Sequence, residues 1–116
     1  MSRRPLDVTA TVKLDGSGKG TAQLGPQVVR EFWQPSQASI NVSTQTNEAS
    51  CILYLGTTII SAQILQETLT GSTGDVYGFN GNFINPGQQL FAVWTGGDAN
   101  ATATLRVIGF KDRYGV

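Results

Sequence analysis

The sequence predicts an all-β protein, a single-domain antiparallel β-sandwich of the jelly-roll-like kind. Runs of alternating apolar and polar residues recur about every ten residues, turn residues separate these runs, and no segment has a convincing helical period. Each run has one apolar face and one polar face. A sheet built from such strands needs a second sheet to cover its apolar side.

The clearest pattern lies between Gln88 and Phe110, where two alternating runs flank a short Gly-rich link. The apolar positions of the two runs, expected on the buried faces, are Leu90, Ala92, Trp94, Ala101, Ala103, Leu105 and Val107. The other face of the second run holds Thr102, Thr104 and Arg106, which tolerate water. These features predict a β-hairpin with one dry side and one wet side.

The N-terminal third predicts a second hairpin and a third strand. Val8 to Leu14 alternates, Asp15 to Gly20 is a Gly-rich turn, and the chain returns along Thr21 to Leu24. Val28 to Gln34 carries bulky side chains on both faces, so we expect this strand to be covered on both sides. Pro35 is expected to end it, because proline cannot donate to a sheet ladder.

The middle of the chain predicts further strands. Ser39 to Thr44 alternates again, and Cys51 to Gly56 is a short, mostly apolar run typical of a buried strand. Ser61 to Thr70 fits either a short helix or a strand. We favour the strand, because its flanks are poor surroundings for a helix and the rest of the chain is β.

The predicted organisation is one domain with two short ends. Residues 1–7 form an N-terminal arm, residues 8–110 the β-sandwich and residues 111–116 a C-terminal tail. A chain of 116 residues can bury a core without metals or disulfides. The charged ends are expected either to fray or to order against a neighbouring subunit.

Composition argues against several kinds of partner. The chain has 8 basic and 8 acidic residues and therefore no net charge, which predicts no nucleic-acid partner. It has no apolar run long enough to span a bilayer and no signal-peptide pattern, so we expect no membrane partner. The single cysteine, Cys51, sits in an apolar run and is expected to be a core residue of a protein made in a reducing cytoplasm.

The sequence has few residues of the types that catalyse reactions or bind metal ions. The sequence has no histidine, which excludes Ser-His-Asp and Cys-His systems and histidine-ligated zinc, and one cysteine cannot supply a zinc site. The carboxylates are scattered one per segment. Asp15 with Ser17, or Asp98 with Asn100, could offer oxygen ligands to calcium, but turn formation explains both pairs better. We expect no enzymatic activity, no cofactor and no metal.

The aromatic residues allow two interpretations. Tyr77, Phe79 and Phe83 alternate with Asn80 and Asn82, so they could form a sugar-stacking platform whose amides contact hydroxyl groups. The other interpretation is packing of the core and of a loop, because phenylalanine is usually buried.

Trp33 and Trp94 lie inside predicted strands. They are expected in the core.

Several motifs together carry a family resemblance. They are TATVKLDGSGKGTAQLGP near the N-terminus, then REFW, CILYLG, GSTGD and the closing PGQQLFAVWTGGDANATATLRVIG. From Val8 to Gly109 the chain resembles small β-sandwich proteins encoded by tailed bacteriophages of actinobacteria. The resemblance implies a virion structural subunit, located in the particle and made in the host cytoplasm. It does not decide between head and tail, and it supplies no catalytic residue.

Our first expectation is a capsid decoration protein that contacts the major capsid protein. Small sandwiches of this size resemble decoration proteins that clamp capsid junctions, often as trimers, so we expect a homo-oligomer. In this interpretation Ser2 to Leu6 or Lys111 to Val116 lies across a neighbouring subunit. The basic residues expected to pair with acidic groups there are Arg3, Arg4, Lys111 and Arg113.

Two alternatives stay open. The chain could be a tail-associated or tail-tip subunit that binds other tail proteins and contacts host surface carbohydrate through the loop from Tyr77 to Phe83, with Tyr77, Asn80 and Asn82 as the contact residues. It could also be a free carbohydrate-binding module, although such modules normally accompany an enzyme or follow a signal peptide.

Overall fold

The computed structural model describes residues 3–44, 46–56, 62–69, 74–79 and 83–114. Two antiparallel sheets of four strands pack face to face, which confirms the predicted all-β sandwich. No helix in this described part of the chain is long and apolar enough to cross a membrane.

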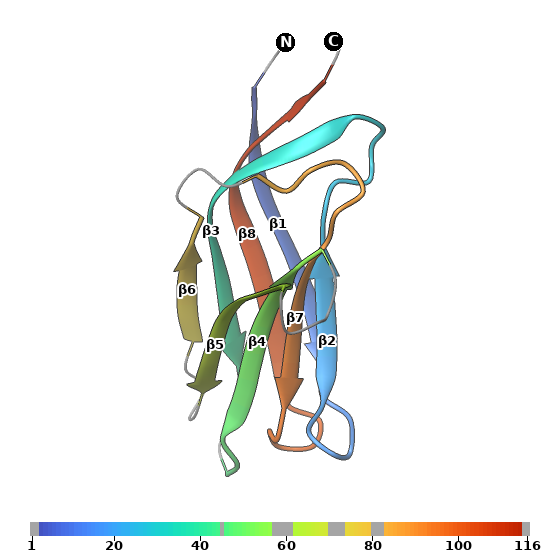
Figure 1. Cartoon of the computed structure of the whole chain (residues 1–116). Helices are drawn as coiled ribbons and strands as arrows, with labels where there is room; N and C mark the ends of the chain where they lie inside the picture. Colours follow the sequence, from blue (N-terminus) through green and yellow to red (C-terminus); the bar gives the residue numbers. More distant parts are fainter. Residues whose placement is uncertain (1–2, 45, 57–61, 70–73, 80–82, 115–116) are drawn as a thin grey trace.

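The strands divide between the sheets in a fixed order (Figure 1). Sheet A contains, from one edge to the other, β1 (Arg4–Lys13), β8 (Thr102–Arg113), β3 (Glu31–Val42) and β6 (Gly74–Gly78). Sheet B contains β2 (Gly20–Leu24), β7 (Leu90–Thr95), β4 (Ala49–Leu55) and β5 (Gln63–Leu69). Within the segment from Ser61 to Thr70, the strand interpretation is confirmed for Gln63–Leu69.

The core lies between the inner faces of the two sheets, as the alternation predicted. The seven apolar residues expected on the buried faces between Gln88 and Phe110 are all buried. Trp33, Trp94 and Cys51 are core residues too. The apolar period of each strand thus locates the core correctly, because side chains two positions apart share a face.

Both predicted hairpins are wrong. β7 and β8 lie in different sheets, and so do β1 and β2, so each turn carries the chain across the sandwich. β1 instead pairs with β8 along its whole length, from Arg4 opposite Lys111 to Lys13 opposite Thr102. The alternating pattern shows which face of a strand is buried. It does not show which strand is the hydrogen-bonded neighbour, because strands of both sheets bury side chains in the same core.

Pro35 does not end a strand. β3 starts at Glu31, later than predicted, and runs without a break to Val42, joining two predicted strands. Its register against β8 shifts between Pro35 and Gln37, so a β-bulge lies at the proline. A bulge tolerates a residue that has no N–H to donate.

The bulge also keeps the apolar face of β3 on the core. Trp33 and Pro35 are buried before it, whereas Ala38 and Ile40 are buried after it, so the buried positions change from odd to even. The residue opposite Pro35 is Gly109, at φ 154°. A Cβ atom at Gly109 would lie 2.5 Å from the Gln34 carbonyl oxygen, so the two strands approach closely here.

The predicted arm and tail are largely parts of strands. β1 begins at Arg4 and β8 continues to Arg113, which places residues 4–7 and 111–113 in sheet A. The two charged ends satisfy each other's backbone groups, because Arg4 lies opposite Lys111 and Leu6 opposite Gly109.

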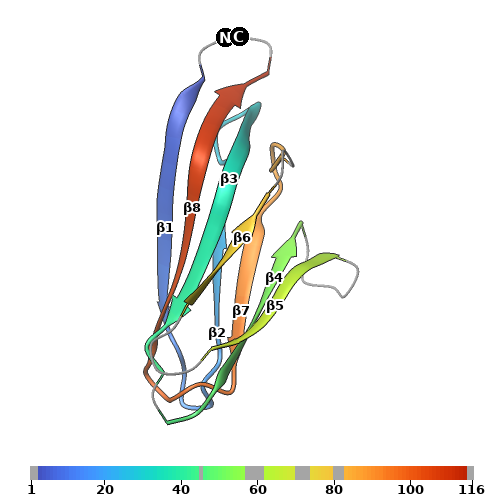
Figure 2. The same cartoon turned by 90° about the vertical axis from the view of Figure 1, so that its left-hand side faces the viewer.

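The molecule is elongated, 49 by 25 by 22 Å. At the end where both termini lie, β1, β8 and β3 extend beyond the strands of sheet B (Figure 2). We call this the terminal end. The turn from β2 into β3 lies there as well (Figure 1).

Candidate binding site at the terminal end

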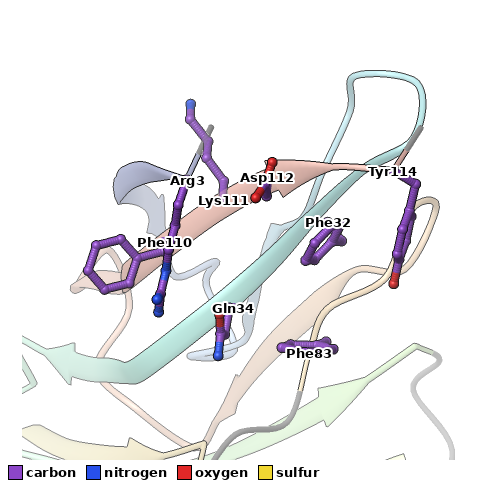
Figure 3. Close-up of a pocket in the computed structure, with 8 residues that line it drawn as sticks. All are labelled: Arg3, Phe32, Gln34, Phe83, Phe110, Lys111, Asp112 and Tyr114. Carbon is purple, nitrogen blue, oxygen red and sulfur yellow. The ribbon is translucent and has the colours of Figure 1, made fainter. Parts of the chain in front are cut away.

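A pocket of about 220 Å³ opens on sheet A at the terminal end (Figure 3). We call it the terminal pocket. Its lining residues are Arg3, Phe32, Gln34, Phe83, Phe110, Lys111, Asp112 and Tyr114.

The pairing of β3 with β8 brings four of these residues to one face. Phe32 lies opposite Asp112, and Gln34 lies opposite Phe110. Directly opposed residues of antiparallel strands share a face. On β3 the neighbouring Trp33 is buried toward the inside, so Phe32 and Gln34 point to the outer face.

Three aromatic rings form one cluster. Phe32 stacks on Tyr114, with 4.4 Å between ring centroids and 26° between ring planes. Phe32 also contacts Phe83 in a tilted arrangement, with 5.7 Å between centroids. Phe83 and Tyr114 are still 41% and 45% exposed. Such a patch of exposed apolar side chains is typical of an interaction site.

A fourth ring is paired with a cation. The Arg3 guanidinium carbon lies 4.0 Å above the Phe110 ring centroid, which is cation–π geometry. Phe110 itself is 42% exposed. The terminal pocket therefore combines an apolar floor with the charged groups of Arg3 and Asp112, whereas the amine of Lys111 points away from the rings (Figure 3).

A buried carboxylate supports the pocket from the inner face of sheet A. Glu31 accepts a hydrogen bond from the Trp33 indole nitrogen at 3.1 Å and another from Arg4 at 3.4 Å. Trp33 in turn exchanges two backbone hydrogen bonds of 2.9 Å with Ile84, which is fully buried. This anchoring of Ile84 positions Phe83, the next residue along the chain.

The terminal end is positively charged although the whole chain is neutral. Five of the eight basic residues lie in or beside the extended strand ends, and they are Arg3, Arg4, Arg30, Lys111 and Arg113. Only two of the eight acidic residues, Glu31 and Asp112, lie there. Glu31 is buried and already accepts two hydrogen bonds.

The four basic residues predicted to contact a partner all lie at this end, but they differ in their surroundings. Arg3 and Lys111 line the terminal pocket. Arg4 forms an ion pair with Glu31 of its own chain. The Arg113 Nε atom is buried and has no hydrogen-bond partner among the described residues. Lys111 lies opposite both Trp33 and Arg4, so its side chain lies on the inner face of sheet A. Arg3 is therefore the basic residue best placed to meet an outside group at the pocket.

Of the predicted glycan contacts, the structure describes Tyr77 and places it outside the terminal pocket. Tyr77 lies on β6, packs against the core and meets Phe79 edge-on, with 5.1 Å between ring centroids. Phe79 is buried. Phe79 therefore packs in the core and Tyr77 packs against it, whereas Phe83 belongs to the terminal pocket. Asn80 and Asn82 lie outside the described residues.

The two carboxylates considered as calcium ligands bind backbone amides instead. Asp15 accepts hydrogen bonds from the backbone nitrogens of Ser17 and Lys19 at 2.8 and 3.1 Å, and these bonds lower the pKa of Asp15. Asp98 accepts from the nitrogens of Thr46 and Asn47 at 3.0 and 2.8 Å. The Asp15 carboxylate therefore stabilises its own turn, as predicted. The Asp98 carboxylate instead links the loop between β7 and β8 to the loop between β3 and β4.

Sequence reasoning missed Phe32, Phe110 and Tyr114 as site residues. One signal was present: the run from Val28 to Gln34 carries bulk on both faces, and the second face is the floor of the pocket. The pairing that brings Phe110 beside Gln34 could not be read from the sequence.

The lining of the terminal pocket suits binding, because aromatic surface supplies contact area and the charged groups supply orientation. In the comparisons with known proteins, no protein-family model and no curated protein sequence matches the chain.

Proposed function

We propose that the chain is a non-enzymatic structural subunit of a bacteriophage particle and that it decorates the surface of the head. Its partner there is the major capsid protein. The family resemblance of the motifs from Val8 to Gly109 supports the particle, and the distribution of apolar surface supports attachment by one end.

One observation carries the attachment. Of the six exposed large apolar side chains among the described residues, five lie at the terminal end. Phe83, Phe110 and Tyr114 line the terminal pocket, and Val28 and Val29 belong to the turn from β2 into β3. The sixth, Val76, lies on β6. A chain that worked alone would gain nothing from gathering apolar surface at one end, whereas a subunit fixed to a lattice buries it there.

Self-association is part of the proposal. In sheet B, Ile52 lies opposite Val93 and Tyr54 opposite Phe91, and all four side chains are half-buried. The residues that alternate with them point into the core, so these four form an apolar row on the outer face of the sheet. Such a row, in place of polar side chains, favours a contact between copies, and a trimer is our first expectation.

Sedimentation of mixtures tests the proposal. The purified protein is mixed with heads that lack decoration and, separately, with isolated tails of the same phage. Saturable binding to heads is the expected result. Binding to tails alone would replace the head assignment with a tail subunit, and binding to neither particle would overturn the virion assignment.

The self-association is tested by light scattering of the purified protein. The expected oligomer should dissociate on Val93→Thr, which keeps the β-branched shape but replaces one methyl group with a hydroxyl. A monomer at all concentrations would overturn this part of the proposal.

A further inference from the structure

We infer that β1 pairs, along its edge away from β8, with β1 of a second copy of this chain. The two strands run antiparallel about a two-fold axis at Ala10, so that two copies of sheet A join into one continuous sheet. The inference goes beyond the proposed function, because this contact does not use the outer face of sheet B. One copy can therefore make both contacts.

The sequence of β1 is symmetric. Residues 6–14 read LDVTATVKL, which is the same in both directions except that Asp7 and Lys13 hold matching positions. Two such segments that run antiparallel with Ala10 opposite Ala10 therefore place identical residues opposite each other throughout. The exceptions are the two charged residues, which are opposite in sign.

Pairing with β8 does not account for this symmetry. Val8 lies opposite Val107, whereas Val12 lies opposite Ala103, so the two halves of the segment have different neighbours on β8. A second β1 is a neighbour with the same symmetry as the segment itself. Closed two-fold contacts are made by surfaces that are complementary to themselves.

The backbone of β1 has groups available on the side away from β8. β1 is 10 residues long and lies at one edge of sheet A (Figure 1). The Leu14 nitrogen donates to the Ala101 carbonyl at 2.8 Å, which continues the register of β1 against β8, and bonded positions alternate along antiparallel strands. The N–H and C=O groups of the odd-numbered residues from 7 to 13 therefore face outward. Pro5 fits this alternation, because its missing N–H falls on the outward side.

The inner face of β1 is incompletely covered in a single chain. Val8, Ala10 and Val12 pack against the core but are only half-buried, whereas Leu105 and Val107 of the neighbouring β8 are fully buried. In the joined sheet, Val8 of each copy would lie opposite Val12 of the other and cover it. Burial of this apolar surface favours association.

The charges on the outer face fix the register. Asp7 binds Arg106, whereas Lys13 forms no ion pair within the described part of the chain. In the joined sheet, Lys13 of each copy would lie opposite Asp7 of the other, so an ion pair closes the contact at each end. A shift of two residues would place Thr11 opposite Asp7 or Thr9 opposite Lys13 and lose these pairs.

Disulfide trapping tests the register. Ala10→Cys is made in protein that carries Val93→Thr, which removes the contact through sheet B. The opposed Ala10 residues form a non-hydrogen-bonded pair with Cα atoms about 4.5 Å apart, within the roughly 4.4–6.8 Å that a disulfide spans. We expect oxidised glutathione to link two copies. Cys51 is buried and stays in place.

Matched cysteine variants control for chance collision. Val8→Cys alone should link at least about fivefold more slowly than Ala10→Cys, because its two sites would lie about 14 Å apart. A mixture of Val8→Cys and Val12→Cys should link as readily as Ala10→Cys, because these two positions are opposite each other. No linking of Ala10→Cys, or equal linking of Val8→Cys alone, would overturn the inference.

Charge exchange tests the two ends of the contact. Asp7→Lys and Lys13→Asp each place like charges opposite one another, and each should weaken dimerisation at least about fivefold in analytical ultracentrifugation. A mixture of the two variants restores opposite charges at both ends and should form mixed dimers. Lys19→Asp, between β1 and β2, makes the same charge change and should have a smaller effect. If the mixture associates no better than either variant alone, the inference is wrong.

Hydrogen exchange identifies the backbone groups in the contact. The amides of Thr9 and Thr11 face outward, so they should be protected in the dimer and lose this protection on dilution. The amides of Val8 and Ala10 bond to β8 and should stay protected at every concentration. Exchange of Thr9 and Thr11 at one rate, over the concentrations at which the protein dimerises, would overturn the inference in favour of another contact.

The inference and the proposed function can fail separately. If the protein joins heads and Ala10→Cys does not link copies, the inference is wrong and the decoration role stands. If copies link in this register and the protein joins neither heads nor tails, the inference stands and the virion assignment is wrong.

Discussion

The Trp33 indole nitrogen donates a hydrogen bond to the carboxylate of Glu31, two residues earlier in β3, with 3.1 Å between Nε1 and Oε1. The second carboxylate oxygen accepts from Arg4 of β1 at 3.4 Å. Because β8 lies between β1 and β3, the contact of Arg4 with Glu31 joins two strands that are not hydrogen-bonded neighbours. The carboxylate thereby ties together the three strands that carry the terminal pocket.

We predict that Glu31→Ala lowers the free energy of unfolding by about 1–3 kcal/mol, because it leaves the buried indole N–H of Trp33 without its acceptor. Urea denaturation measures the change. Arg4→Ala should lower the free energy by less than about 1 kcal/mol, because the Arg4 side chain is 43% exposed. An equal loss of unfolding free energy in both variants would contradict the conclusion that the hydrogen bond from the Trp33 indole is the stronger of the two bonds to Glu31.

Gly109 allows the close approach of β8 to the bulge of β3. We predict that Gly109→Ala lowers the free energy of unfolding by about 1–3 kcal/mol, because φ is 154° and the new Cβ would lie 2.5 Å from the Gln34 carbonyl oxygen. Urea denaturation again measures the loss. Gly16→Ala is the control, since nothing lies within 4 Å of a Cβ there and the change should stay within about 0.5 kcal/mol.

Cys51 should be chemically inert in the folded chain. Burial raises the pKa of its thiol from 9.0 to about 12, and the thiolate is the reactive form. We predict no labelling by a thiol reagent at about pH 8 in buffer and complete labelling in urea. Rapid labelling of the folded protein would contradict the burial.

The same shift predicts a pH dependence. The fold favours the neutral thiol of Cys51, so this contribution to stability is complete below pH 9.0 and is lost as the pH rises toward the folded pKa of about 12. Urea denaturation across this pH range should therefore show that the free energy of unfolding falls with rising pH in the wild type, and that it falls less in Cys51→Ala. Parallel pH profiles of the two proteins would contradict this prediction.

Asp7 and Arg106 form an exposed pair on the outer face of sheet A, with two hydrogen bonds of 2.9 and 2.8 Å. The hydrogen-bonded Arg106 guanidinium holds the pKa of Asp7 below its usual 3.8. The stability contributed by the ionised pair is therefore present above pH 3.8 and is lost as the pH falls through the lowered pKa. We predict that Arg106→Gln returns the pKa of Asp7 toward 3.8 in a carboxyl NMR titration.

Asp15 is the internal control for that titration. Its pKa is lowered by backbone hydrogen bonds from Lys19 and Ser17, which Arg106→Gln does not touch. The pKa of Asp15 should therefore stay unchanged. A shift of both carboxyls would indicate a general loss of structure instead of the loss of one pair.

The sequence was sufficient to predict which face of each strand is buried, but it was insufficient to predict which strands pair with one another. Leu105 and Val107 are buried as their alternation predicts, because a half-buried strand requires it. The turn Asp15 to Gly20 looks like a hairpin, yet it carries the chain from sheet A to sheet B. Turn residues favour a reversal of direction, and a reversal within one sheet has the same local chemistry as a reversal between two sheets.

The bulge had a sequence signal that the proline obscured. Trp33 and Ala38 are an odd number of positions apart, so they can share a face only if one residue is inserted between them. Pro35 suggested a strand end and hid this. The terminal pocket had less signal, because Phe32, Phe83 and Phe110 come from three distant segments and only the β3–β8 register brings them together.

The position of β8 has a consequence for biosynthesis. β8 follows every other strand in the sequence, yet it is an inner strand of sheet A and pairs with both β1 and β3. Until β8 is translated, β1 and β3 have no common neighbour in sheet A. Sheet A therefore closes after translation of β8, and the pairing of β1 with β8 across almost the whole sequence makes this a slow step in which a nascent chain depends on protection from aggregation.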